Sequence, residues 1–516
     1  MYRNLFSVGA LTLLSRAAGF IRDVMLGAAL GTGVLADAFY IAFRLPNHFR
    51  AIFGEGAFNA AYVPSYARVL ETEGSEQARS FASRIFTLLL LAQIVLLVLA
   101  WAFTPQILAV LAPGVDRNPE KLALATTMTR ITFPYLLCIT LALLQSGTLN
   151  ANRRFVAAAF APVLLNVAMI ACLSLAFLFP NAGLAASWGV ALAGLAQLGL
   201  VSAAAWRAGV AARIARPRRD RESKMFFRTF GPAVIGSAGV QIALFADTII
   251  ASLLPRGGIS IIYYADRIYQ LPIGVIGVAA GAVLLPEMSR RHAAGDAHAA
   301  LHAQSRAMAL TIALTAPFCV AFLTIPELIM RGVFMRGRFT AQAAAASAHV
   351  LAAYGIGLIA VVLIASALAS FQAQGDTKTP MVASLISVAL NVALKIALFR
   401  PFGAPGLAFA TALGAWTNFA LLAAIALKGG SMRLDAIFWK IGAAALVGGL
   451  AAAALAWFLP GAVAPLVAWL PAFRNESALL IALAGIFALY GAVFGLGLVG
   501  SGVWRPGRTK RALGPA

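Results

Sequence analysis

Arginines recur at a fixed spacing inside two apolar segments near the start of the chain. Arg16 and Arg22 lie six residues apart, and so do Arg44 and Arg50. In a helix, six residues rise about 9 Å and turn through roughly 600°, so the two members of each pair share one broad face. The guanidinium group stays charged in any environment and can donate two parallel hydrogen bonds to a phosphate. The spacing therefore predicts a cationic helix face that holds a phosphate or pyrophosphate.

Acidic residues accompany these arginines but are fewer in number. Asp23, Asp37 and Glu55 lie in the same two segments, and Asp266 precedes Arg267 in a later one. A site that exports cations needs more acids than bases. The balance of charge therefore favours an anion as the ligand.

Two of the acids are direct neighbours of an arginine, as in Arg22–Asp23 and Asp266–Arg267. Adjacent residues on a helix point about 100° apart and do not face each other. We therefore expect neither neighbouring pair to form a simple face-on ion pair. The alternative for the whole set is that each arginine pairs with a nearby acid or extends to the membrane surface.

The composition is that of an integral membrane protein. Of 516 residues, 61% are hydrophobic and 11% are charged, and the mean hydropathy is +0.87. The apolar runs are about 20 to 25 residues long, the length at which a helix crosses a bilayer. They predict an all-α polytopic protein with about fourteen transmembrane helices. Cys138, Cys172 and Cys319 all fall in these runs and are predicted to be small core residues, without a disulfide or metal.

Most of the 40 lysines and arginines fall on one side of this predicted topology. That side contains the sequences NANRRF, WRAGVAARIARPRRDRESK and RPGRTKR. The positive-inside rule makes it cytoplasmic and places both termini there. The net charge of +22 is thus explained by topology and contact with membrane lipids, and it does not indicate a nucleic acid partner.

The sequence resembles itself at a spacing of about 222 to 225 residues. YIAFRLP at 40–46 matches YYADRIYQLP at 263–272, and LNVA occurs at 165–168 and again at 390–393. The repeat predicts six-helix bundles at 1–206 and 226–428, joined by a basic cytoplasmic linker at 207–225. Two additional helices at 429–500 and a basic tail at 501–516 follow. Paired bundles around a central cavity are typical of transporters.

Motifs for catalysis are missing from the sequence. There is no GxxxxGKS/T phosphate-binding loop and no constellation around a nucleophile. His298 and His302 have the spacing of a zinc-binding helix, but no glutamate or third ligand accompanies them. We therefore expect a protein that is not an enzyme and that needs no metal or other cofactor.

Several stretches resemble the lipid II flippase family (MurJ, also called MviN) of the multidrug/oligosaccharidyl-lipid/polysaccharide exporter superfamily. They are SRAAGFIRD, ADAFYIAFRLPNHFRAIFGEGAFNAAYVP, YYADRIYQLP and GDTKTP, and the similarity extends over essentially the whole chain. The resemblance implies a fourteen-helix protein of the bacterial inner membrane. It would carry undecaprenyl-pyrophosphoryl disaccharide-pentapeptide (lipid II) from the inner to the outer leaflet for peptidoglycan synthesis.

The resemblance also implies roles for particular residues. The essential cavity arginines of the family match Arg16, Arg22, Arg50 and Arg267, and accompanying acids match Asp23, Asp37 and Glu55. The spans 436–459 and 476–500 correspond to helices that form a groove for the polyprenyl tail. Outward movement of an anionic substrate is favoured by an inside-negative membrane potential, which would supply the coupling.

One position departs from the family pattern. Some members bind sodium at positions that match Asp247, Asn391, Lys395 and Thr411, and Lys395 stands where a carboxylate is expected. We expect that the ammonium of Lys395 replaces the cation and pairs with Asp247. The alternative is that Lys395 extends to the nearer membrane surface.

Other functions compatible with the sequence are export of another lipid-linked glycan and drug/cation antiport within the same superfamily. A third is a non-transporting scaffold for cell-wall assembly, whose arginines only fix helix packing. The expected partners are lipid II, membrane lipids and the peptidoglycan synthesis machinery.

Overall fold

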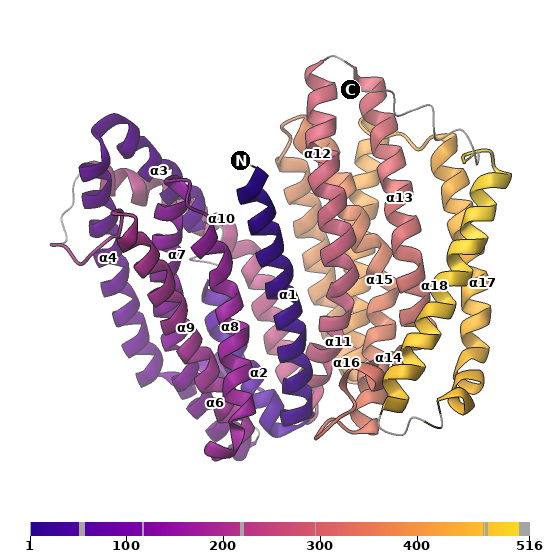
Figure 1. Ribbon diagram of the computed structural model, residues 1–516, viewed down its shortest axis with the longest axis horizontal. Coiled ribbons are helices and arrows are strands. Elements are labelled where there is room, and N and C mark those ends of the chain that lie inside the picture. The colour runs from indigo at the N-terminus through magenta and orange to yellow at the C-terminus, as the bar shows by residue number, and fades with distance from the viewer. Residues whose placement is uncertain are drawn as a thin grey trace. The chain divides into compact units, whose positions relative to one another are not determined.

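The computed structural model describes residues 2–50, 57–115, 118–216, 221–294, 296–467, 469 and 473–504, and all of their regular elements are helices (Figure 1). Nine of the helices in these ranges are long and apolar enough to cross a membrane. The all-α polytopic fold class is confirmed. The count of fourteen spans stays a prediction. Cys138, Cys172 and Cys319 are free thiols.

The chain folds as two compact units. Unit 1 comprises residues 1–260 with 336–339, and unit 2 comprises residues 261–335 and 340–516. The helices of unit 1 are α1 (Tyr2–Leu30), α2 (Val34–Arg50), α3 (Ala57–Glu73), α4 (Ser75–Ala102), α5 (Thr104–Leu111), α6 (Pro119–Thr132), α7 (Pro134–Ala151), α8 (Val156–Ser174), the short 3-10 helix η2 (Ala176–Leu178), α9 (Ala182–Arg207) and α10 (Arg221–Ser252).

Helix α10 packs inside unit 1, although the repeat assigns its sequence to the second bundle. Phe226 of α10 is fully buried against Phe58 and Tyr62 of α3 and Phe81 of α4, with ring centroids 5.8 to 6.5 Å apart. The packing division therefore falls at Ser260, after α10, rather than in the linker. Packing and sequence repetition divide a chain by different criteria, so the predicted domain boundaries stay a prediction.

Unit 2 is formed by the remaining helices. Helix α11 (Gly258–Pro272) begins in unit 1 and continues into unit 2. It is followed by a π-helical turn η3 (Ile273–Gly277), α12 (Val278–Ala293), α13 (Ala297–Thr324), α14 (Pro326–Phe334), α15 (Ala341–Ala373), α16 (Lys378–Lys428), α17 (Ala436–Leu466) and α18 (Arg474–Gly500).

Helix α16 is two helices joined at a kink. Gly403 has φ 59° and ψ −137°, a conformation outside the helical region that favours glycine. Pro401 and Pro405 flank the kink and remove backbone donors there. The 51 residues of α16 therefore contain two separate apolar arms, in the places where spans 380–400 and 404–427 are predicted.

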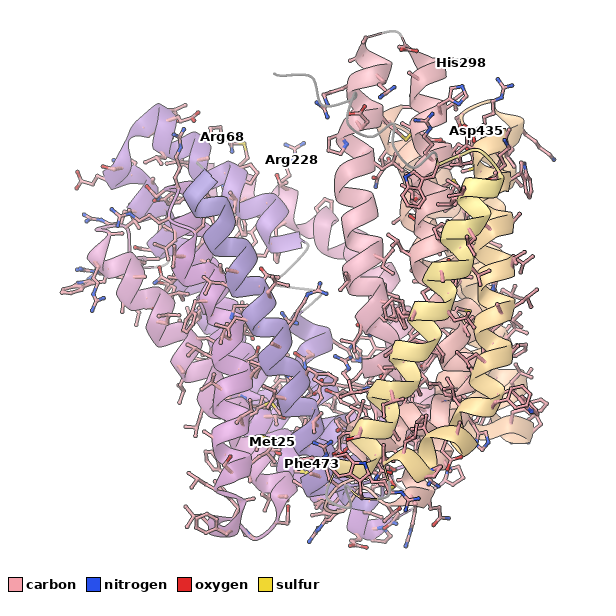
Figure 2. All side chains as sticks on the ribbon, turned by 45° about the vertical axis from the view of Figure 1, so that its right-hand side comes forward. Met25, Arg68, Arg228, His298, Asp435 and Phe473 are labelled. Carbon is pink, nitrogen blue, oxygen red and sulfur yellow. The ribbon has the colours of Figure 1, made fainter. Side chains whose placement is uncertain are left out.

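The two additional helices, α17 and α18, are joined to the rest of unit 2 by polar contacts. Asp435 caps α17 by accepting from the Phe438 N–H at 2.9 Å. It also contacts His302 Nδ1 at 2.9 Å and accepts from Ser305 Oγ at 2.8 Å, both on α13. Burial opposes ionisation of Asp435, but these hydrogen bonds outweigh it and lower the pKa of the carboxyl. Asp435 and His298 lie at the same end of unit 2 (Figure 2). His302 therefore contacts the residue that caps α17.

Candidate functional site

Arg22 is buried in unit 1 and forms hydrogen bonds with side chains of two helices, α1 and α8. Its Nε and Nη2 donate to Asp23 Oδ1 at 3.0 and 2.7 Å, and its Nη1 donates to Asn166 Oδ1 of α8 at 2.8 Å. The expectation that Arg22 and Asp23 form no pair was wrong. The angle between neighbouring Cα–Cβ bonds did not prevent contact, because the long arginine side chain folds back over the short aspartate.

Asn166 fixes the orientation of this guanidinium. Its Nδ2 donates to the carbonyl of Ser15 on α1 at 2.9 Å, so its amide oxygen is directed at Arg22. The Arg22 Cζ also lies 5.9 Å from the ring centroid of Phe43 on α2. Three helices therefore position one charged group, and three of its five N–H donors are engaged by these contacts. A fixed guanidinium plane of this kind suits bidentate recognition of a phosphate.

The other predicted cationic residues of unit 1 are less buried. Arg16 is exposed on α1, and Arg44 is half-buried on α2. Arg50, the last residue of α2, is half-buried, and its Nε is 3.4 Å from Asn47 Oδ1. Glu55 lies outside the described residues. Asp23 thus contacts Arg22 in the structure. Arg16, Arg44 and Arg50 lie at positions that are at least partly exposed.

Helix α2 is joined to α10 by a histidine that the sequence did not suggest. His48 Nε2 is 3.2 Å from Thr248 Oγ1, and the His48 ring lies 5.0 Å from the ring of Phe245. Thr248 follows Asp247, the predicted ion-site residue of α10, whose side chain is half-buried. This contact holds the polar stretch of α10 beside α2.

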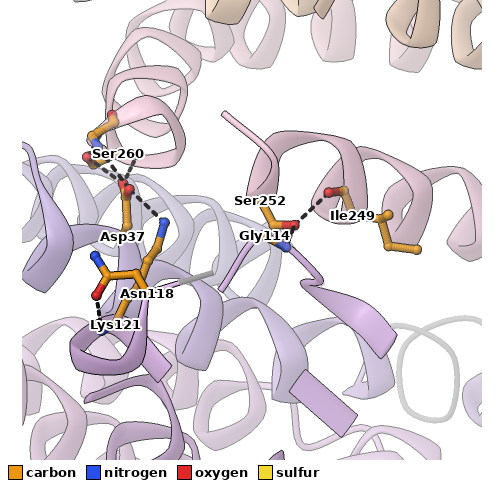
Figure 3. A network of polar contacts seen from close by, with 8 residues as sticks. Asp37, Gly114, Asn118, Lys121, Ile249, Ser252 and Ser260 are labelled. Atoms are coloured by element: carbon orange, nitrogen blue, oxygen red, sulfur yellow. Dashed lines mark hydrogen bonds and ion pairs between the residues drawn. The ribbon is translucent and has the colours of Figure 1, made fainter. Parts of the chain in front are cut away.

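Asp37 is the centre of a buried network at the other end of α2 (Figure 3). It is 0% exposed and lies 3.1 Å from Lys121 Nζ of α6. Its two oxygens also accept from Gly257 N–H at 2.9 Å, Ser260 N–H at 3.0 Å and Ser260 Oγ at 2.9 Å. Four hydrogen bonds, one of them from the Lys121 ammonium, therefore satisfy a carboxylate that has no access to water.

The backbone around this network is arranged for close contact. Asn118 caps α6 by accepting from the N–H groups of Glu120 and Lys121, which fixes the first turn that carries Lys121. Gly114 N–H donates to Ser252 Oγ at 3.1 Å (Figure 3), and a Cβ at position 114 would lie 1.8 Å from the Ser252 carbonyl oxygen. Only glycine fits there. The loops before α6 and after α10 are therefore packed backbone to backbone in unit 1.

Arg267 belongs to unit 2 and also pairs with its neighbour. Its Nη2 donates to Asp266 Oδ2 at 3.0 Å, which again corrects the expectation that adjacent residues do not pair. Gln270 donates to the same oxygen at 2.8 Å, and the Arg267 Cζ lies 4.8 Å from the Tyr263 ring centroid. The Arg267 side chain is 32% exposed, so it is oriented yet accessible to a ligand.

Three of the predicted ion-site residues lie on the two arms of α16. The kink brings Gly414 against Asn391, where a Cβ on the glycine would lie 2.9 Å from the Asn391 Cβ. Lys395, one turn after Asn391, is only 3% exposed, and Thr411 Oγ1 donates to the Leu407 carbonyl of its own helix. Lys395 is therefore a buried residue of unit 2 and does not reach solvent.

Unit 2 contains an apolar groove of about 980 Å³. Its walls come from α11 and η3, α12, α13 and α18, including Leu314 and Phe318 of α13 and Phe487 of α18. The basic side chains of Arg291 and Arg306 lie along its lining. Its dimensions and apolar walls suit a long hydrocarbon chain.

A sequence model described as lipid II flippase MurJ matches residues 26–470 of the chain. The chain belongs to the MurJ lipid II flippase family. A relative in Rhizobium meliloti (strain 1021), described as a probable lipid II flippase MurJ, is 40% identical over 504 residues, which are 96% of this chain and 94% of the relative.

Solved structures support the fold of the MurJ family. One of a lipid II flippase MurJ in an inward closed conformation superposes with a TM-score of 0.78 at 23% identity, covering 96% of this chain and 99% of that one. An inward-facing multidrug resistance MATE transporter of the MOP superfamily gives a TM-score of 0.67 at 14% identity, over 82% and 97% of the two chains. The chain therefore shares its fold with both structures.

Several polar residues that organise this MurJ-family chain were missed in the sequence. Asn166, Lys121, Ser260 and His48 all hold a predicted charge or its helix. The repeated word LNVA contains Asn166 in its first copy and Asn391 in its second, so a repeated polar residue in an apolar run was a usable signal. Lys121 and Ser260 carry no comparable mark.

Proposed function

We infer that this chain moves lipid II from the inner to the outer leaflet of the bacterial inner membrane, where peptidoglycan synthesis consumes it. The observation that carries the inference is the family match over residues 26–470. Export of another lipid-linked glycan, drug/cation antiport and a scaffold role receive no comparable support. The chain acts as a transporter and has no catalytic residues, and both termini face the cytoplasm, in line with the positive-inside rule.

The pyrophosphate of the lipid binds to the arginines. The arginines assigned to this role are Arg16, Arg22, Arg50 and Arg267. A charged headgroup in hydrocarbon would lose its hydration at a large cost in free energy, which fixed guanidinium donors offset. Asp23 and Asp266 keep two of these arginines paired in the absence of substrate, so the pyrophosphate competes for the same N–H donors.

The polyprenyl tail stays in an apolar environment during transport. The groove of unit 2 has the capacity for part of such a chain, with Leu314, Phe318 and Phe487 along its walls. Arg306, which also lines the groove, is suited to contact with a phosphate group rather than with the hydrocarbon chain. Headgroup and tail thus use different surfaces of the protein.

Transport requires the two units to move, and one of the points at which the chain passes between them lies within α11. This helix starts in unit 1, where Asp37 binds its first turn, and passes into unit 2 after Ser260. The first turn of α11 therefore acts as a fixed end. Movement of unit 2 is then transmitted along the part of α11 that carries Asp266 and Arg267.

The deciding experiment measures lipid II in the outer leaflet of cells depleted of their own flippase. The cells receive this chain, its Arg267→Ala variant, or the control Arg400→Ala, which removes an exposed arginine of the same unit. A reagent that cleaves lipid II only from outside reports exposure, and membrane levels of the three chains are matched.

We expect the wild type and Arg400→Ala to restore exposure, and Arg267→Ala to restore less than a tenth of it, since loss of a charge-assisted bidentate contact costs about 1.5–3 kcal/mol. If Arg267→Ala restores exposure fully, the assignment of Arg267 fails while flipping stands. If the wild type itself restores none, the inferred substrate is wrong.

Sodium is not required for this activity in our proposal. Lys395 places a buried basic side chain at a position where the family resemblance implies a carboxylate of the ion site. The melting temperature of the purified chain should accordingly be the same in sodium and in potassium chloride at equal ionic strength. A sodium-dependent rise in melting temperature that Asp247→Ala removes would overturn the proposal.

A further inference from the structure

Besides the groove of unit 2, the protein has a pocket in unit 1 that is lined by three arginines. It has a volume of about 490 Å³ and lies where the end of α7, the start of α8 and the end of α9 meet. Arg153, Arg154 and Arg207 line it, and its apolar lining includes Phe160 and Leu200. All of these residues belong to one compact unit, so the pocket does not depend on how the two units move.

The loop that presents two of these arginines has a defined conformation. Arg153 has φ 58°, the left-handed region that non-glycine residues rarely adopt. The Arg154 N–H donates to the Leu149 carbonyl at 2.9 Å. Asn152 donates to the Thr148 carbonyl at 2.8 Å and to the Tyr66 hydroxyl of α3 at 3.2 Å. These bonds hold an unfavourable backbone conformation, which is a common feature of binding sites.

The pocket carries positive charge that no ion pair between described residues neutralises. Arg153, Arg154 and Arg207 take part in none of the ion pairs found among the described residues. The sequence contains no aspartate or glutamate between positions 149 and 160 or between 200 and 207. Three permanent charges therefore converge on one pocket, and an anionic ligand would be their counterion.

Exposed apolar side chains adjoin the arginines. Phe155 is 37% exposed and Val156 55% exposed at the start of α8, and Trp206 beside Arg207 is 66% exposed. Exposed tryptophan next to basic residues is typical of the membrane interface, where basic pockets between helices bind lipid headgroups. A free anion would use the arginines but would gain nothing from the apolar surface beside them.

We propose that this pocket binds the phosphate of an anionic phospholipid, phosphatidylglycerol, from the leaflet on the positively charged side of the protein. The phosphate contacts Arg153, Arg154 and Arg207, and the acyl chains lie along Phe155 and Val156. This lipid is a bound component of the transporter and is not its cargo, so the proposal goes beyond the function inferred above.

The test compares two variants that each remove three positive charges. The site variant is Arg153→Gln/Arg154→Gln/Arg207→Gln, and the control is Arg68→Gln/Arg213→Gln/Arg228→Gln, which changes exposed arginines of the same unit outside the pocket. Arg68 and Arg228 are labelled in Figure 2. Delipidated full-length protein is titrated with phosphatidylglycerol or phosphatidylcholine, and bound lipids are counted by native mass spectrometry.

We expect the wild type and the control to bind the first phosphatidylglycerol at least about 10-fold more tightly than phosphatidylcholine. The site variant should bind both lipids equally. A milder variant, Arg154→Gln/Arg207→Gln, keeps Arg153 and therefore leaves the strained loop unchanged. It should show an intermediate preference for phosphatidylglycerol, and it tests the proposal even if the triple variant does not fold.

Two results would overturn the proposal. Equal loss of preference in the site variant and the control would mean that general surface charge, rather than this pocket, attracts the lipid. Loss of lipid II binding by the site variant in phosphatidylglycerol-free detergent would mean that the pocket is part of the cargo site. Failure of the flipping experiment with Arg267 would leave this test unaffected.

Discussion

Replacement of Arg22 by lysine is expected to slow lipid II flipping at least about 100-fold while the chain remains folded in the membrane. The guanidinium contacts Asp23 through Nε and Nη2 and Asn166 through Nη1 at the same time. A lysine ammonium is a point charge that can pair with Asp23 but cannot also reproduce the planar fork. The bond that orients the group on Asn166 and the second hydrogen bond to the pyrophosphate are then lost, each worth about 1.5–3 kcal/mol.

The measurement is the initial rate of lipid II exposure in flippase-depleted cells, at matched membrane levels. Arg68→Lys serves as the control, because Arg68 is an exposed arginine of the same unit. A scaffold whose arginines only balance charge would tolerate lysine at position 22. Wild-type exposure with Arg22→Lys would therefore favour that function over phosphate recognition.

Replacement of Asp37 by asparagine is expected to destabilise the protein by about 3–5 kcal/mol, because it leaves a buried lysine without its counter-charge. Lys121 is only 5% exposed and has Asp37 at 3.1 Å. The asparagine would also turn its NH₂ group toward the N–H groups of Gly257 and Ser260, which now donate hydrogen bonds to the carboxylate. Two donors would then face each other. Both effects act on a network of unit 1 and not on the substrate.

Thermal unfolding in detergent tests this expectation. Asp296→Asn is a matched control, since Asp296 is an exposed helix cap for which asparagine is an equal substitute. The double variant Asp37→Asn/Lys121→Met should recover part of the lost stability, because no buried charge then lacks a partner. An Asp37→Asn chain as stable as Asp296→Asn would show that the network contributes little.

The fold class was predictable because it follows from composition alone. Long apolar runs, breakers such as the glycine and prolines near position 403, and the bias of basic residues are local features of the sequence. The position of α10 was not predictable in the same way. Phe226 packs on Phe58 and Tyr62 of α3, and the shape of such contacts is set by tertiary packing rather than by hydropathy.

The site was predictable as a set of charges, but its contacts were not. Arg22 and Arg267 stand out because charge is costly in an apolar run. Their pairing with adjacent acids depends on side-chain length and rotamer, which helical geometry alone does not give. Lys121 begins a moderately polar helix and has the sequence character of an interfacial residue. Nothing in the sequence connects it with Asp37, 84 residues away.

The Asp37 network also has a consequence for biosynthesis. Its partners emerge late, Lys121 after a further 84 residues and Ser260 after 223. At about 5–20 residues per second, the carboxylate waits roughly 4–17 s for the lysine and 11–45 s for the serine. The Asp37 network of unit 1 can therefore be completed only when the first turn of α11 has left the ribosome. A nascent chain that stalls within α10 presents the membrane quality-control machinery with a charged, half-assembled bundle.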